Sequence, residues 1–351
     1  IIAYIRGEVE DVTIDDSIAF GIQDTQQAIE FLKDAIKHPS TFIALDSETT
    51  GLYPRDGHML GISVCYDGAT GAYIDTECFD ETVEQLLAQL CREKTVVFHN
   101  AKFDMGFMEY ELNFIFPDWE DTMLLHYCLE EAVGTHGLKP LALRFTDLGD
   151  YERELDDYKK TWARRNKVKL AEFNYGMLPA EILAPYACKD ADATFQLYNK
   201  FKPLVDKSKE FTNLYTTILK PATIALKRLE KNGGPVDTNA VDNLQKSYQI
   251  DVEECIDEIS NNPAVQRFER IHNKTFNPNS TMQLRELFFN ILKIKPSKKT
   301  ETGAFSVDKE VLQNMDHPLA EAVLDLREKS KMAGTYISNI VNGIDKDGRL
   351  R

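Results

Sequence analysis

The period of the apolar residues changes near Asp121, and this change limits what the chain can fold into more than any other feature. Between residues 43 and 121, short apolar runs alternate with turn residues, a pattern typical of buried strands. The runs cover residues 42–45, 59–65, 71–75 and 95–98. An Asp-Gly pair at 67–68 predicts that the second and third runs form a hairpin. Helical spacing at 81–91 and 104–112 completes an α/β pattern with at least one antiparallel pair.

After Asp121 the apolar residues recur at helical spacing. This spacing predicts helices at 123–129, 186–201, 214–229 and 241–259. Lys-Asn-Gly-Gly-Pro at 231–235 should end the third of them, because glycine adopts the left-handed C′ conformation and proline cannot continue a helix. We expect an N-terminal segment (1–40), an α/β domain (41–206) and an all-helical region (207–351), with the main boundary near Lys207.

The charge balance restricts how the chain can contact nucleic acid. Its 57 acidic and 41 basic residues give a formal net charge of −16, which argues against a protein that coats nucleic acid by displacing counterions. A nuclease remains compatible, because metal ligands are carboxylates and a local basic strip can hold a strand. Two such strips lie at 159–169 and 293–299, although each alone is more often a solvated face.

Other sequence signals point to a reduced, cytoplasmic protein. No apolar run is long enough to span a bilayer, and no leader opens the chain, so we expect no membrane partner. The six cysteines form no C-x-x-C pair, which favours buried thiols over a zinc site. If the chain is of bacteriophage origin, this location is the host cytoplasm.

Two carboxylates stand two residues apart where the first strand ends. Residues two apart in a strand point to the same face, so Asp46 and Glu48 should lie side by side. Two anions this close repel each other, and a bound divalent cation is the commonest way to neutralise this repulsion. A polar strand end with both side chains in solvent is an equally weighted alternative.

Two further acidic positions follow in the sequence. Asp104 comes after the strand at 95–98 and a polar turn, so it should reach the carboxyl edge of the sheet, although alone it is more simply a helix-capping anion. Pro185 suits the first turn of a helix, which would put Tyr186 and Asp190 on one face. In isolation this spacing is more often chance, and Asp192 lies on another side of that helix.

The order D-x-E, N-x-x-x-D, Y-x-x-x-D resembles the tyrosine branch of the DEDD exonuclease superfamily. It is most similar to the proofreading domain of family A DNA polymerases, and residues 121–124 and 137–141 match the segment between its second and third motifs. The resemblance implies a ribonuclease H-like mixed-sheet domain that removes nucleotides from DNA 3′ ends. It also implies two divalent ions, Mg²⁺ or Mn²⁺, as cofactors.

The resemblance also assigns roles to the motif residues. Asp46, Glu48 and Asp190 would hold one ion, Asp46 would bridge to the second, and Asp104 would support the second through water. Tyr186 would orient the attacking water, because a phenol is too weak an acid to act mainly as a base at neutral pH.

Neighbouring residues receive implied DNA contacts. Leu52 would wedge against the terminal base, with a plain core leucine as the alternative, and Asn100 would contact the strand. His99 and His136 are more simply structural.

The helical region resembles the thumb of family A polymerases. The segment F-N-x-x-S-x-x-Q-L at 276–284 opens the match, which continues in order through 298–303, 305–308 and 326–336. The thumb grips duplex DNA through its phosphates. The residues expected to contact DNA are Asn279, Ser280, Lys298, Lys299, Thr300, Ser306 and Lys331.

The sequence departs from the family in one respect: neither the palm aspartate pair nor the fingers helix is present. We therefore expect no polymerase site on this chain, with palm and fingers either on a second polypeptide or cut away. An active proofreading exonuclease with its thumb is the favoured reading. The alternatives are a stand-alone degradative nuclease, which the thumb match opposes, and a non-catalytic DNA-binding or assembly subunit, which the complete ligand set opposes.

Overall fold

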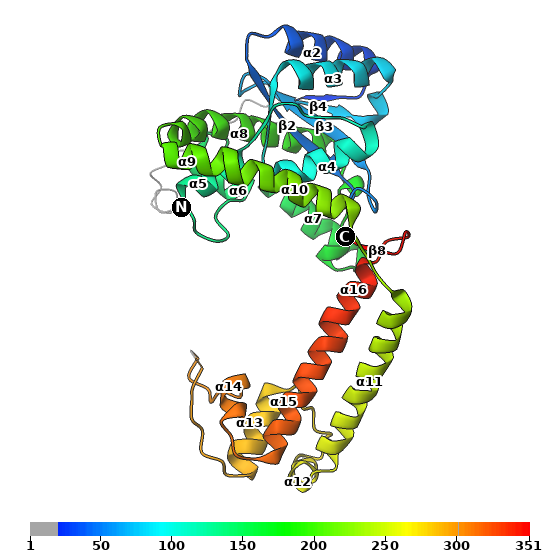
Figure 1. Ribbon diagram of the computed structural model, residues 1–351, viewed down its shortest axis with the longest axis vertical. Helices are drawn as coiled ribbons and strands as arrows, with labels where there is room; N and C mark the ends of the chain where they lie inside the picture. Colours follow the sequence, from blue (N-terminus) through cyan, green and yellow to red (C-terminus); the bar gives the residue numbers. More distant parts are fainter. Residues whose placement is uncertain (1–19, 301) are drawn as a thin grey trace. The chain divides into compact units, whose positions relative to one another are not determined.

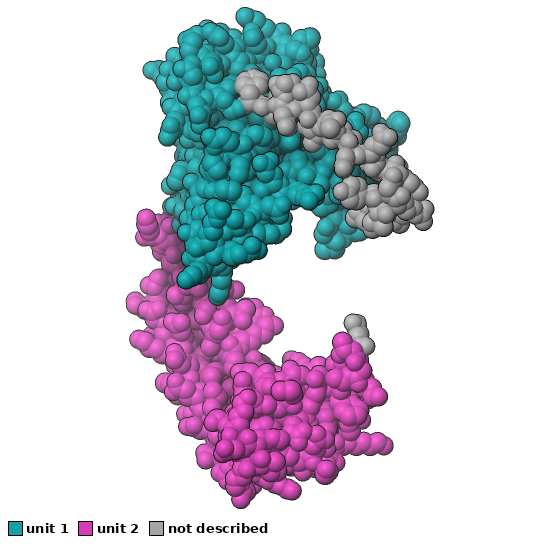
Figure 2. All heavy atoms as spheres, turned by 180° about the vertical axis from the view of Figure 1, so that it is seen from behind, with its two compact units in different colours: residues 1–228 teal, residues 229–351 magenta. Residues whose placement is uncertain are grey.

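The structure, a computed structural model, describes residues 20–300 and 302–351. Residues 1–19, part of the predicted N-terminal segment, lie outside the described residues. The chain divides into two compact units, residues 1–228 and 229–351 (Figure 2). No helix in the described part of the chain is long and apolar enough to cross a membrane.

The first unit is built on a six-stranded mixed sheet. Its spatial order is β1 (Phe20–Ile22), β4 (Ala72–Asp75), β3 (Met59–Cys65), β2 (Phe42–Thr49), β5 (Thr95–Phe98) and β6 (Trp119–Asp121). Strand β3 is antiparallel to both β2 and β4, and the other pairs are parallel. The predicted hairpin and mixed α/β sheet are confirmed.

Helices cover both faces of this sheet (Figure 1). On one face lie α2 (Thr25–Lys37) and α3 (Glu81–Glu93), and on the other α8 (Ala180–Asp206). The alternation along β2 follows these layers: Ile43 and Leu45 share a core with α2 and α3, whereas Ala44 packs with α8. Because Asp46 and Glu48 have the parity of Ala44, both carboxylates face α8.

Shorter elements connect these layers. They are η2 (Thr76–Cys78), α4 (Ala101–Leu112), α5 (Thr122–Leu129), α6 (Leu138–Phe145), α7 (Arg153–Asn166), η3 (Leu170–Glu172) and η4 (Tyr175–Met177). The sequence analysis did not predict β1, α2 or α7. The expectation for Pro185 was wrong, because α8 already begins at Ala180, after Pro179, and Pro185 lies inside the helix.

Three further segments pack on the first unit or lead out of it: α9 (Lys209–Asn213), the π-helical turn η5 (Leu214–Leu219) and α10 (Lys220–Asn232). Tyr215 is buried there, and its hydroxyl accepts a hydrogen bond from the Asp121 amide at 2.9 Å. Residues 207–228, which we expected to belong to the helical region, therefore pack with the sheet unit. The predicted functional boundary near Lys207 stays a prediction.

The second unit is mostly helical, as predicted. Its helices are α11 (Thr238–Ser260), α12 (Pro263–His272), α13 (Thr281–Arg285), η6 (Glu286–Ile291), α14 (Lys309–Gln313), α15 (Pro318–Lys331), η7 (Met332–Ile337) and α16 (Ser338–Gly343). They enclose a core that includes Phe268, Phe288 and Val323. Two short strands, β7 (Gly234–Pro235) and β8 (Arg349–Leu350), pair antiparallel.

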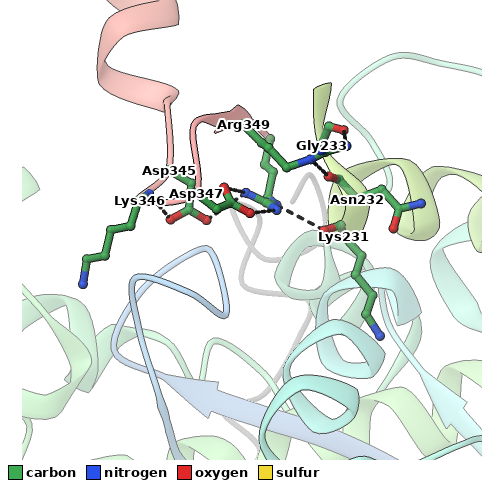
Figure 3. Close-up of polar contacts among 8 residues, drawn as sticks. Lys231, Asn232, Gly233, Asp345, Lys346, Asp347 and Arg349 are labelled. Atoms are coloured by element: carbon green, nitrogen blue, oxygen red, sulfur yellow. Dashed lines mark hydrogen bonds and ion pairs between the residues drawn. The ribbon is translucent and has the colours of Figure 1, made fainter. Parts of the chain in front are cut away.

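Two arginines tie β8 to the end of α10. Arg349 donates from Nε to the Asn232 carbonyl at 2.5 Å and from a terminal nitrogen to the Gly233 carbonyl at 3.1 Å (Figure 3). Arg351 donates to the Lys231 carbonyl at 3.1 Å. The last carbonyls of a helix have no partner within it, so these arginines supply a cap. Gly233, with φ of 59°, ends the helix as the sequence predicts.

Candidate functional site

Three carboxylates converge between β2 and α8. Ligand oxygens of Asp46, Glu48 and Asp190 all lie within 4.8 Å of one another, the single such group among the described residues. Asp46 is partly buried, and Glu48 and Asp190 are buried. Oxygen donors this close together and out of solvent match the ligands that hard divalent cations prefer.

Asp104 reaches the same strand from α4. Its Oδ1 accepts hydrogen bonds from the Ser47 amide at 2.9 Å and the Ser47 hydroxyl at 2.7 Å. The side chain is therefore directed at β2 from the first turn of α4. Asp104 lies outside the group of three, yet near enough to raise the pKa of Asp46.

The carboxylates perturb one another strongly. Burial, with the Asp190 charge second, raises the pKa of Glu48 to about 8. Burial raises the pKa of Asp104 to about 7 against the lowering effect of the Ser47 hydrogen bonds. The pKa of Asp46 is raised well above its ordinary value by burial and by the charge of Asp104. Without a cation, the cluster resists full ionisation.

Sequence reasoning missed two residues that contact the cluster. The Tyr151 hydroxyl donates to Asp190 Oδ1 at 2.6 Å, and the Lys139 ammonium forms an ion pair with the same oxygen. Lys139 also lies 4.1 Å from the ring centroid of Tyr186. The one signal for Lys139 was its place in the matching segment 137–141, and nothing in the sequence distinguished Tyr151.

Tyr186 lies beside the cluster on α8, one turn before Asp190. Its side chain is buried, and burial together with the Asp190 charge raises its pKa far above the ordinary range. The hydroxyl therefore stays protonated and can donate a hydrogen bond at any ordinary pH. The Tyr186 ring packs edge to face with Tyr175, at a centroid distance of 6.2 Å.

The two residues expected to contact the DNA strand lie near the ends of β2 and β5. Leu52 is 75% exposed, so it is not the core leucine of the alternative reading. Asn100 adopts a left-handed conformation (φ 71°) before α4. The backbone N–H of Asn100 donates to Asp121 Oδ1 at 3.1 Å, which fixes the turn before α4. Their contacts with DNA stay predictions.

The histidines have structural partners. His99 Nδ1 lies 2.8 Å from the Thr122 hydroxyl, and His136 Nδ1 lies 2.8 Å from His126 Nδ1. Asp192 is buried away from the cluster of three, where burial raises its pKa to about 6.

Two residues of unit 2 that were predicted to contact DNA, Lys298 and Ser306, have partners within the protein. Lys298 forms ion pairs with Glu310 at 2.5 Å and Asp308 at 3.3 Å. Ser306 is buried, and its amide donates to the Lys298 carbonyl at 2.9 Å.

Of the other residues predicted to contact DNA, two form hydrogen bonds within the protein and three are exposed. Ser280 caps α13, and Thr300 donates its amide to the Ala304 carbonyl at 2.7 Å. Asn279, Lys299 and Lys331 are exposed.

Comparison with known proteins agrees with this geometry. Residues 20–206 match the 3′-5′ exonuclease family, and residues 244–351 match DNA polymerase family A. The DNA polymerase of Escherichia phage T5 is 38% identical over 341 residues, covering 94% of this chain and 40% of that protein. The chain belongs to DNA polymerase family A. It carries that family's 3′-5′ exonuclease domain, which implies the use of divalent metal.

More distant members of family A match the same region. DNA polymerase I of Treponema pallidum is 26% identical over 88% of this chain and 33% of its own length. The solved POL domain of Pol1 from M. smegmatis, in complex with DNA primer-template and dNTP, shares the fold with a TM-score of 0.64 at 18% identity. That likeness covers 94% of this chain and 51% of the solved one. The chain spans between 32% and 50% of the length of the curated relatives it matches.

Proposed function

We propose that this chain removes nucleotides from the 3′ end of DNA by metal-dependent hydrolysis at Asp46, Glu48 and Asp190. The observation that carries the proposal is the approach of these three carboxylates, from two elements far apart in sequence, to within 4.8 Å. Burial and mutual repulsion raise the pKa values of Asp46 and Glu48 despite the lowering effect of the Lys139 charge, so both side chains favour an additional positive charge. The donor set fits Mg²⁺ or Mn²⁺.

Two ions are proposed, with Asp46, Glu48 and Asp190 holding one, and Asp46 and Asp104 holding the other. When bound, such ions neutralise charge on the attacking and leaving oxygens of a phosphodiester and make water more acidic. The protein supplies the remaining functions. The Tyr186 hydroxyl would orient the attacking water by a hydrogen bond, and it stays protonated because its pKa is raised.

The first experiment digests single-stranded DNA labelled at its 5′ end. With Mg²⁺ or Mn²⁺ the purified chain should shorten the strand from its 3′ end, and EDTA should stop it. Asp46→Ala or Asp190→Ala should abolish digestion while the fold persists, because each removes one repelling carboxylate. Unchanged turnover in either variant would exclude this site.

The second experiment uses Tyr186→Phe, which removes one hydroxyl and keeps the ring. Positioning and proton-transfer contributions of such groups are about 10²-fold or more, so the rate should fall by that order while DNA affinity holds. A variant as fast as the natural chain would mean that the water is held elsewhere.

We also propose that the exonuclease serves as the proofreading part of a polymerase whose palm and fingers lie outside these 351 residues. The palm and fingers motifs are missing from these 351 residues, so the chain alone should not extend primers. In α15 and η7, Leu319 and Val323 are buried in the unit's own core, whereas Tyr336 stays 50% exposed. Exposed apolar side chains of this kind are available to a partner.

Mixing the chain with a palm-bearing family A polypeptide tests this proposal. A complex should form that extends primers and removes mismatched ends, with Lys299 and Lys331 contacting the duplex phosphates. If sedimentation finds the chain monomeric in that mixture, or if it extends primers unaided, the divided-polymerase proposal fails.

A further inference from the structure

The segment between α7 and α8 places a second tyrosine next to Tyr186. Tyr175 lies in η4, and its hydroxyl accepts a hydrogen bond from the Lys159 ammonium of α7 at 2.9 Å. The same ammonium lies 4.6 Å from the centroid of the Tyr175 ring. The Lys159 ammonium thus restrains both the hydroxyl and the ring of Tyr175.

The backbone around Tyr175 is anchored to the strand that carries the carboxylates. Asn174 donates from Nδ2 to the carbonyl of Thr50, just beyond β2, at 2.6 Å. Gly176 passes so close to Thr50 that an added Cβ would lie 3.3 Å from its Cγ2. Tyr175 is therefore positioned both by α7 and by the end of β2.

The chemistry of these donors gives the contact a direction. An ammonium can only donate hydrogen bonds, so the Tyr175 hydroxyl must accept from Lys159. The Tyr175 oxygen keeps a second lone pair for a neighbouring donor. Tyr186 packs edge to face against Tyr175, with an interplanar angle of 77°. The hydrogen bond between the two hydroxyls raises the pKa of Tyr186, as expected when Tyr186 donates and Tyr175 accepts.

We propose that Tyr175, held by Lys159, is a positioning residue that fixes the orientation of the Tyr186 hydroxyl. A hydroxyl that donates to Tyr175 has its lone pairs left to accept a hydrogen bond from the attacking water. The Lys159 charge also reaches the carboxylates, because it opposes the rise in the pKa of Glu48. This inference rests on the proposed function, in which Tyr186 orients that water.

The first test compares two tyrosine-to-phenylalanine variants. Tyr175→Phe keeps the ring and deletes the hydroxyl, so the single-turnover rate on single-stranded DNA should fall about tenfold. The dissociation constant for DNA, measured in Ca²⁺, should not change. Tyr158→Phe is the matched control, because Tyr158 lies on α7 and contacts Phe173 by its ring, at 6.4 Å. It should cleave at the natural rate.

The decisive test is a double-mutant cycle. If Tyr175 acts through Tyr186, then Tyr175→Phe combined with Tyr186→Phe should be no slower than Tyr186→Phe alone. Lys159→Met should slow the natural chain at least as much as Tyr175→Phe does, because it also removes the charge that opposes the rise in the pKa of Glu48. Thermal unfolding of each variant shows whether the fold is kept.

The outcomes distinguish failure of this inference from failure of the proposed function. If Tyr186→Phe is slow while Tyr175→Phe matches the natural rate, the positioning role is overturned and the exonuclease proposal stands. Additive losses in the cycle also overturn the positioning role. If Tyr186→Phe itself cleaves at the natural rate, the role of Tyr186 and this inference fail together.

Discussion

Glu48 shows how one residue of a buried carboxylate cluster lowers the stability of the folded protein before a cation binds. Its pKa is raised to about 8, whereas an unfolded chain would keep it near its ordinary value of 4.5. A group whose folded pKa is raised contributes its full stability below the unfolded pKa and loses it as the pH rises through the folded pKa. In EDTA, the natural chain should therefore lose stability from this group between about pH 4.5 and pH 8.

Glu48→Gln tests this expectation. Glutamine keeps the shape and cannot ionise, so in EDTA at pH 8 the variant should melt on the order of 10 °C above the natural chain. The gap should close as the pH approaches 5. Adding Mn²⁺ should stabilise the natural chain more than the variant. A gap that stays constant from pH 5 to pH 8 would contradict the assignment of the raised pKa.

The site could be predicted to the extent that its residues follow strand and helix periods. Asp46 and Glu48 share a face because they stand two apart in a strand, and Asp190 follows Tyr186 by one turn of α8. Lys139 and Tyr151 reach Asp190 only because α6 and the segment before α7 fold back on α8. Contacts of this kind, between residues far apart in the sequence, have no local signature.

At the scale of elements, strong periodicity predicted the strands β2 to β5 and the helices α3, α5 and α11. Strand β1 is three residues long, which is too short for a visible alternation. Helix α7 is mostly polar, and its buried residues are Leu155 and Ala163. Pro185 gave a false start for α8, because the helix begins at Ala180 and continues through this proline.

The π-helical turn η5 carries a prediction at the same scale. Tyr215→Phe would leave the buried Asp121 amide without its hydroxyl acceptor, at a cost of about 1–3 kcal/mol. Chemical denaturation should report this loss in the unfolding free energy of unit 1. Tyr110→Phe, which alters a 54% exposed side chain, is the control and should change little. Equal losses in the two variants would contradict the role given to Tyr215.

For the whole molecule, the separate cores of the two units predict separate thermal transitions. The proposed metal ligands all lie in residues 1–228, whereas the second core is formed by residues such as Phe268 and Phe288. Mn²⁺ should therefore raise only the transition that Tyr215→Phe lowers, as seen by differential scanning calorimetry. A single transition, or a metal shift in both, would indicate that the units unfold as one.

The pairing of β7 with β8 also determines when each unit can be completed during synthesis. All strands of the large sheet lie before Thr122, so the sheet can assemble early as the chain leaves the ribosome. Gly234, in contrast, must wait for Leu350, and the α10 carbonyls must wait for Arg349 and Arg351. Long-range pairing of this kind forms late because the loop must close first. Until Arg351 has left the ribosome, β7 and the end of α10 lack these partners. Chaperones and proteases can then reach this part of the second unit.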